Sequence, residues 1–179
     1  MPAAPAIAAL ESRFFPAAQP STRLIVVLHG LGDSLEGFTW MPPMLRLPWL
    51  NYLLVNAPHP YFIGYAWYDI ENPEPGVLQG RALLRRLFAE LAAQGWPAAD
   101  TLLFGFSQGC LMALDFALRQ GGRLAGIVGG SGYAFALERL PAELHPLACE
   151  QAWLVTHGTQ AELLPLARTR AQMARLRAL

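Results

Sequence analysis

The hydrophobic residues of this chain fall into short runs separated by turns and by segments with helical spacing. Five runs are rich in Val, Ile and Leu, and each soon meets Gly or Pro. Continuous apolar runs without polar alternation are typical of strands that are buried on both faces. They predict strands over residues 23–28, 51–56, 102–104, 124–132 and 152–158.

Helical spacing appears between these runs. Residues 77–95 place Leu and Phe side chains on one face and most of their charged side chains on the other, and Gly95 then ends the helix. Further helices are expected after Gly109 and from Pro165. Strands that alternate with helices predict the α/β class. We therefore expect one domain over residues 1–179, with a mostly parallel sheet covered by helices on both faces.

In four segments the hydrophobic residues show neither helical nor strand periodicity. Residues 1–21 predict a loose lead-in, residues 34–50 a short helix interrupted by two prolines, and residues 133–149 irregular or partly helical structure. Residues 61–76 are rich in aromatic side chains, and a long loop of this kind is more typical of a pocket wall than of a plain connection. Aromatic side chains folded onto the core beneath a surface loop remain the alternative.

Composition narrows the range of functions. Hydrophobic residues make up 54% of the chain and charged ones 15%, and thirteen basic residues balance thirteen acidic ones. This balance predicts no nucleic-acid partner. The two cysteines, Cys110 and Cys149, are too few for a disulfide framework, and the histidines are too scattered for a metal site. The N-terminus does not resemble a signal peptide and no run is long enough to span a membrane, so we expect a cytoplasmic protein.

The strongest chemical signal is the stretch Gly105-Phe106-Ser107-Gln108-Gly109, which joins a predicted strand to a predicted helix. A serine on such a strained turn presents its hydroxyl outward, so Ser107 is the candidate nucleophile. Gly relieves the crowding of backbone segments at positions 105 and 109. The N–H of Gln108, at the first turn of the helix, is expected to face a developing oxyanion. The alternative is a glycine-rich turn without catalytic meaning.

A second signal is the turn His29-Gly30-Leu31-Gly32-Asp33, which follows the first predicted strand. A loop in this place commonly lends the other backbone N–H of an oxyanion hole, and we expect Leu31 to supply it. A plain turn in which a local hydrogen bond fixes His29 is the alternative. His29 lies on the loop that would hold the substrate oxygen, so it is a poor candidate for the general base.

Four stretches together resemble the phospholipase/carboxylesterase family of α/β-hydrolases, which includes the acyl-protein thioesterases. The resemblance covers roughly residues 22–179 and is carried by Leu28-His29-Gly30-Leu31-Gly32-Asp33, Ala66-Trp67-Tyr68-Asp69-Ile70, Gly105-Phe106-Ser107-Gln108-Gly109 and His157-Gly158-Thr159-Gln160. It implies a Ser-Asp-His triad, an apolar acyl groove, no cofactor, and hydrolysis of small-molecule carboxylic esters or acyl thioesters through an acyl-enzyme. It also implies that Leu31 and Gln108 form the oxyanion hole and that Ile63, Tyr65 and Trp67 line the pocket.

The chain departs from the family pattern at the other two members of the triad. The acid's position is Ala161, and a methyl group cannot orient an imidazole. Glu162 is adjacent and is the alternative acid, although side chains at neighbouring positions are expected to point in different directions. In the family the catalytic His follows one more strand, beyond the helix that begins near Pro165, and none of the four histidines fits that place. We therefore expect the C-terminal strand and helix of the fold to be missing, and catalysis to be crippled.

Three hypotheses follow from these features. The first is a serine hydrolase acting through Ser107, with its activity reduced by Ala161 and by the lack of a base. The second is a non-catalytic homologue that binds acyl chains or a protein partner. The third is a shortened or engineered form of a working esterase. In each, residues 152–156 form an apolar edge without a neighbouring strand, which favours self-association.

Overall fold

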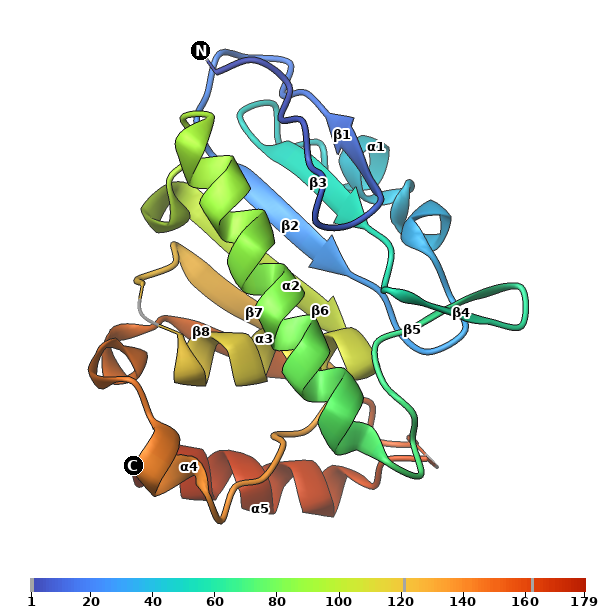
Figure 1. Cartoon of the computed structure of the whole chain (residues 1–179), viewed down its shortest axis with the longest axis vertical. Helices are drawn as coiled ribbons and strands as arrows, with labels where there is room; N and C mark the ends of the chain where they lie inside the picture. Colours follow the sequence, from blue (N-terminus) through green and yellow to red (C-terminus); the bar gives the residue numbers. More distant parts are fainter. Residues whose placement is uncertain (1, 121, 162) are drawn as a thin grey trace.

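A six-stranded sheet organises the computed structural model of this chain, which describes residues 2–120, 122–161 and 163–179 (Figure 1). Its strand order is β1-β3-β2-β6-β7-β8. All pairs are parallel except β1 with β3. The strands are β1 (Ser12–Phe15), β2 (Leu24–Leu28), β3 (Asn51–Val55), β6 (Thr101–Phe106), β7 (Gly126–Gly130) and β8 (Trp153–Thr156). The five strands expected from the apolar runs are thus all present.

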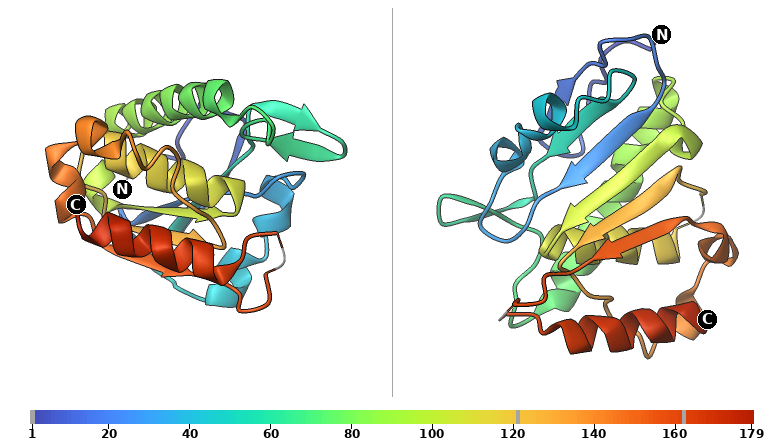
Figure 2. Two further views of the ribbon diagram at one scale, coloured as in Figure 1. Left: turned by 90° about the horizontal axis from the view of Figure 1, so that it is seen from below. Right: turned by 180° about the vertical axis from the view of Figure 1, so that it is seen from behind.

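Helices lie on both faces of the sheet, as the alternation of strands and helices predicts. The long helices α2 (Pro73–Ala93) and α3 (Gln108–Arg119) cover one face, and the short η1 (Leu35–Phe38) and α1 (Met41–Leu45) lie on the other (Figure 2). Two apolar clusters reflect this division. One joins Val26, Leu28 and Leu53 to α2 and α3, whereas the other joins Ile25, Val27 and Leu54 to η1 and α1.

The second face is covered unevenly. The register aligns one row of side chains across five strands, because Leu54 pairs with Val27, Val27 with Phe104, Phe104 with Val128 and Val128 with Leu154. Leu54 is fully buried beneath η1 and α1, but Leu154 is 58% exposed. The row therefore begins in the core and ends in solvent. Strand β8 is the outermost of the sheet, so its outer edge has no strand partner among the described residues.

The lead-in expected over residues 1–21 is wrong in part, because it contains a strand. β1 pairs antiparallel with β3, from Ser12 opposite Val55 to Phe15 opposite Tyr52. Phe14 packs edge-on against Trp96 with 5.6 Å between the ring centroids. A four-residue strand at the edge of a sheet leaves little apolar pattern in the sequence, since only its packing and its partner hold it.

The aromatic segment over residues 61–76 also differs from the expected loop. It contains most of a hairpin, formed by β4 (His59–Tyr61) and β5 (Gly64–Ala66), and the first turn of α2. Pro73 begins that helix, and its missing N–H costs nothing there because the first turn has no intrahelical acceptors. Pro42 and Pro43 likewise stand in the first turn of α1, so they begin that helix rather than interrupt it.

The remaining elements complete the sheet's C-terminal side. A short α4 (Leu140–Glu143) and η3 (Pro146–Glu150) account for the segment expected to be partly helical, and η2 (Ala98–Asp100) precedes β6. Helix α5 (Leu166–Arg177) follows β8 and lies beside it (Figures 1 and 2). Within the described part of the chain, no helix is both long and apolar enough to cross a bilayer.

Candidate active site

Ser107 occupies a strained corner between β6 and α3. Its backbone has φ 53° and ψ −113°, and its side chain is partly exposed. A non-Gly residue in the left-handed region is uncommon and persists only where its surroundings hold it there. One restraint is the hydrogen bond from the Ser107 N–H to the carbonyl oxygen of Gly130, at 2.8 Å. The turn therefore places Ser107 at the carboxyl edge of the sheet.

Close backbone approach explains the two glycines that flank Ser107. A Cβ on Gly105 would lie 2.1 Å from the carbonyl oxygen of Gly109, and a Cβ on Gly109 would lie 2.2 Å from that of Leu28. Both distances are far inside van der Waals contact with backbone atoms that cannot move aside. The crowding expected from the sequence is confirmed, and any larger residue would push helix α3 away from the sheet.

The loop after β2 lies against this corner. A Cβ on Gly30 would be 3.2 Å from the Cβ of Ser107, so the two backbones are neighbours. The hairpin holds the loop from the other side, because Gly32 N–H donates to the Tyr65 carbonyl at 2.8 Å and Tyr65 N–H donates to the Asp33 carbonyl at 2.8 Å. Leu31 therefore lies in a fixed turn beside Ser107.

Leu31 and Gln108 carry the two backbone amides that were expected to form the oxyanion hole. Gln108 is the first residue of α3, where N–H groups have no intrahelical acceptor, and Leu31 stands in the turn beside it. Among the described residues, neither N–H has a hydrogen-bond acceptor. The positive end of the α3 dipole lies behind the Gln108 amide and favours negative charge there.

The Gln108 side chain has a role that the sequence analysis did not find. Its Oε1 accepts a hydrogen bond from the Trp67 N–H and its Nε2 donates to the Tyr68 carbonyl, each at 2.9 Å. The indole N–H of Trp67 in turn donates to the His29 carbonyl at 3.0 Å. This buried clamp joins helix α3 to the chain that leaves the hairpin. In the sequence, the only indication of this role is that a polar residue directly follows the candidate nucleophile.

The three residues expected to line the pocket lie at different depths. Ile63 is at the hairpin tip and fully exposed, whereas Trp67 is fully buried. Tyr65 is partly buried, and its hydroxyl donates to Glu11 at 3.2 Å. The three therefore do not form a single described cavity, and their role as pocket lining stays a prediction.

None of the four histidines forms a hydrogen bond with Ser107 within the described chain. His29 is buried, its Nδ1–H donates to the Gly30 carbonyl at 2.7 Å, and its Nε2 accepts from Ala57 N–H at 3.0 Å. Burial lowers the His29 pKa and keeps the ring neutral. The Nδ1 of His145 accepts from the Leu147 N–H. His59 begins β4, and both ring nitrogens of His157 are buried without a partner.

The acid's expected position carries no polar group. Ala161 follows β8 in a partly buried turn, where its methyl lies 3.9 Å from the place of a Cβ on Gly158. Glu162, considered as a substitute, lies outside the described residues. The part of the chain that the structure describes contains no cluster of three metal-ligating side chains.

Two other polar groups near the corner are structural. The Tyr68 hydroxyl donates to that of Tyr133 at 3.4 Å, and burial raises the Tyr68 pKa. The thiol of Cys110 packs against Gly129 and Gly132, and burial raises its pKa to about 12. A thiol with this pKa stays protonated at neutral pH, so Cys110 is not a competing nucleophile.

The comparison with known proteins agrees with this architecture. Residues 11–179 match the phospholipase/carboxylesterase family. Acyl-protein thioesterase 1 of Schizosaccharomyces pombe is 33% identical over 158 residues, which cover 80% of this chain and 70% of that protein. The crystal structure of esterase PE8 superposes with a TM-score of 0.84 at 29% identity and covers 94% of this chain and 84% of its own.

A plant structure extends the likeness of the fold. The crystal structure of Zea mays acyl-protein thioesterase 2 has a TM-score of 0.77 at 21% identity, with 94% of this chain and 84% of that one covered. Together with the strained serine corner on a mostly parallel sheet, the matched residues establish the assignment. The chain belongs to the phospholipase/carboxylesterase family of α/β-hydrolases.

Proposed function

We propose that Ser107 is the nucleophile of a serine hydrolase that acts on small-molecule carboxylic esters or acyl thioesters. The observation that carries this proposal is the left-handed backbone of Ser107 at the end of β6, with a partly exposed side chain. Strain of this kind collects at functional sites, where the surroundings maintain it. Membership of a hydrolase family supports the same reading.

In the proposed reaction, the Ser107 Oγ attacks the carbonyl carbon of the substrate and its proton leaves for a base. The carbonyl oxygen becomes an oxyanion and accepts hydrogen bonds from the N–H groups of Leu31 and Gln108. Collapse of this intermediate expels the alcohol or thiol, which takes up a proton, and leaves an ester of Ser107. Water then attacks this acyl-enzyme, releasing the carboxylic acid and restoring the hydroxyl.

We further propose that this chain performs the reaction slowly, because the described residues place neither an acid nor a base of a triad beside Ser107. Ala161 stands at the position of the acid, and each described histidine has other surroundings than Ser107. An oxyanion hole and binding alone give a rate of roughly 10³ to 10⁴ over water in the best-studied protease. Ile63, Tyr65 and Trp67 remain the proposed acyl contacts.

Hydrolysis of p-nitrophenyl butyrate by the chain and by Ser107→Ala tests the nucleophile. We expect a slow rate that Ser107→Ala abolishes, together with covalent labelling of Ser107 by a fluorophosphonate. A rate that Ser107→Ala leaves unchanged, without labelling, contradicts the proposed role. Fast Ser107-dependent turnover contradicts the proposed loss of the base.

Added imidazole gives a sharper test of the missing base. We expect imidazole to accelerate ester hydrolysis more in the wild-type chain than in Ser107→Ala, since only the former has a hydroxyl for it to deprotonate. Ala161→Asp should increase this rescue, because a carboxylate at that position can orient the added base. Equal acceleration of the two chains would show that imidazole attacks the ester directly.

A second candidate is a non-catalytic homologue that binds an acyl chain or a protein partner. The position of Ala161 and the exposed end of the Leu54-to-Leu154 row favour it. Its partner could be a second copy joined through the outer edge of β8. Sedimentation of the wild-type chain and of a β8 variant, Leu154→Lys, distinguishes a dimer formed through this edge from a monomer. A monomer with measurable esterase activity excludes this second candidate.

A further inference from the structure

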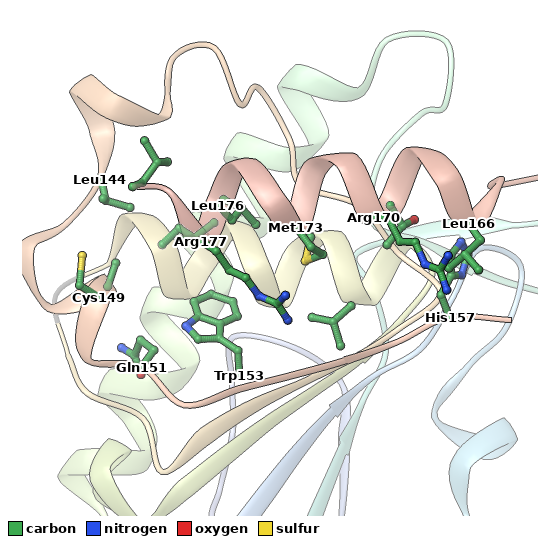
Figure 3. A pocket seen from close by; sticks show the side chains of 15 residues that line it. Leu144, Cys149, Gln151, Trp153, His157, Leu166, Arg170, Met173, Leu176 and Arg177 are labelled. Carbon is green, nitrogen blue, oxygen red and sulfur yellow. The ribbon is translucent and has the colours of Figure 1, made fainter. Parts of the chain in front are cut away.

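A hollow that does not include Ser107 lies between strand β8 and helix α5 (Figure 3). We call it the β8–α5 groove. It has a volume of about 640 Å³, which falls within the range of small-molecule sites. Most of its lining is apolar and comes from α3, η3, β8 and α5, and includes Leu118, Leu144, Trp153, Val155, Met173 and Leu176.

The floor and roof of this groove are each one face of a regular element. Trp153, Val155 and His157 alternate along β8 and its end, so they point to the same side of the sheet. On α5, Thr169, Met173 and Leu176 recur at spacings of four and three residues and face β8. The floor is therefore made of side chains rather than of free backbone groups, which suits an apolar chain better than an added strand.

Two of the four arginines of α5 line the groove, Arg170 and Arg177. Figure 3 shows Arg170 with His157 and Leu166 at one end, and Arg177 nearer Leu144 and Cys149 at the other. Within residues 2–120, 122–161 and 163–179, both ring nitrogens of His157 are buried without a hydrogen-bond partner, a state that costs free energy unless a ligand supplies one. Arg170 has no ion-pair partner in the described part of the chain.

The positive charge of α5 favours a negatively charged ligand. Its sequence, LARTRAQMARLR, contains four arginines and no acidic residue. A second copy of the chain would bring a second basic helix to this groove, and like charges would repel. A negatively charged occupant is attracted instead, and Arg170 and His157 can both donate hydrogen bonds to a carboxylate.

We infer that the β8–α5 groove binds a long-chain carboxylate. Its head group lies against Arg170 and His157, and its chain runs over Trp153 and beneath Met173 towards Leu144. The four residue steps from Trp153 to His157 span roughly 13 Å at ~3.3 Å per residue, which suits an acyl chain of about ten carbons. This site does not depend on the activity of Ser107.

Calorimetric titration of the full chain with dodecanoate, below the concentration at which it forms micelles, tests the inference. We expect binding of one molecule and at least tenfold weaker binding of dodecan-1-ol, which has the chain without the charge. Octanoate should bind roughly 15-fold more weakly than decanoate, because ~0.8 kcal/mol is lost for each of the two methylenes that the groove no longer buries. Equal affinity for the acid and the alcohol, or no binding of the acid, overturns the proposal.

Matched variants of α5 locate the head group. We expect Arg170→Gln and His157→Phe each to weaken dodecanoate binding about tenfold, the loss of one charge-assisted hydrogen bond, and to leave dodecan-1-ol unaffected. Arg175→Gln removes the same charge from the same helix at a position outside the groove, so affinity should be unchanged. An equal loss in Arg175→Gln would mean that only the net charge of the helix matters.

Photo-crosslinking separates this groove from the proposed active site. A dodecanoate analogue with a diazirine at its terminal carbon should label residues 140–153 or 171–177, and Ser107→Ala should label equally well. Labelling of the hairpin or of residues 105–108 would place the carboxylate at the Ser107 site and overturn the groove. The hydrolysis assays do not enter this outcome, so the two proposals can fail separately.

Discussion

The chain contains two His-Gly pairs at the carboxyl ends of parallel strands, and their surroundings are opposite. His29, after β2, is buried and uses both ring nitrogens, one towards the Gly30 carbonyl and one towards the Ala57 N–H. His157, after β8, also buries both ring nitrogens, but neither has a partner in the part of the chain that the structure describes. The same dipeptide is therefore fully hydrogen-bonded in one place and keeps a buried, unsatisfied ring in the other.

Position in the sheet explains the difference. β2 lies between β3 and β6, so loops from both neighbours close over its end. β8 has β7 on one side only, and helix α5 rather than a strand follows it. The centre of the sheet is thus determined by many mutual contacts, whereas its β8 end keeps free polar groups, an exposed Leu154 and a groove.

The largest difference in stability is expected when one methyl group is added either at the centre of the sheet or after β8. Gly105→Ala places a Cβ 2.1 Å from a backbone oxygen, and Gly158→Ala places one 3.9 Å from the Ala161 methyl. We expect Gly105→Ala to lower the free energy of unfolding by about 3 kcal/mol or more. Gly158→Ala should leave it unchanged or raise it by up to ~1 kcal/mol. Urea denaturation followed by circular dichroism measures both, and a similar effect of the two would contradict the contrast.

The aligned row of side chains gives the next test, since Leu54 and Leu154 stand at its two ends. Leu54 is fully buried and Leu154 is 58% exposed. Leu54→Ala leaves a cavity beneath η1 and α1 and should cost ~2–5 kcal/mol of stability. Leu154→Ala should change stability by less than ~0.5 kcal/mol. A large cost for Leu154→Ala, dependent on protein concentration, would reveal that another molecule covers this end.

The two histidines can be compared by the same substitution. His29→Phe leaves the buried Ala57 N–H without its acceptor, and should cost about 1–3 kcal/mol. His157→Phe removes two buried nitrogens that lack partners, so stability should be unchanged or slightly higher. Thermal denaturation in ligand-free buffer measures the pair. Strong destabilisation by His157→Phe would mean that its ring is bonded after all.

The smallest effect is a pH dependence that arises from His29. Burial lowers its pKa in the folded chain below the ordinary 6.5. Well above pH 6.5 the His29 ring is neutral in both the folded and the unfolded chain. As the pH falls below 6.5, the unfolded chain binds a proton before the folded chain does. The free energy of unfolding therefore decreases, by at most ~1.4 kcal/mol per pH unit. His29→Phe should flatten this part of the profile between pH 7.5 and 5. An unchanged slope would assign it to another group.

Much of the fold could be predicted from the sequence because its central strands are continuous apolar runs. The elements that were missed are held by distant partners. β1 depends on β3, and the hairpin of β4 and β5 is fixed by Gly32 and Asp33, some thirty residues away in sequence. The expected start of α2 at residue 77 was wrong, because the helix begins at Pro73 and its first turn, which has no apolar period, accepts proline.

The turn at Ser107 was easier to predict from the sequence than the distant contacts that hold it. The glycines and Ser107 are adjacent in sequence, and their geometry follows from local crowding. The side-chain clamp of Gln108 could not be found in this way, because Trp67 is forty-one residues distant and only the folded chain brings them together. The unpartnered ring of His157 likewise depends on where α5 lies, which no local pattern determines.

The hairpin connects the two amides beside Ser107 to a single mechanical part. One of its strands exchanges hydrogen bonds with the loop that carries Leu31, and the chain that leaves it is gripped by the Gln108 side chain. Its tip, Phe62 and Ile63, extends into solvent. The hairpin therefore contacts the supports of both amides, so we expect a substitution that moves it to disturb Leu31 and Gln108 together.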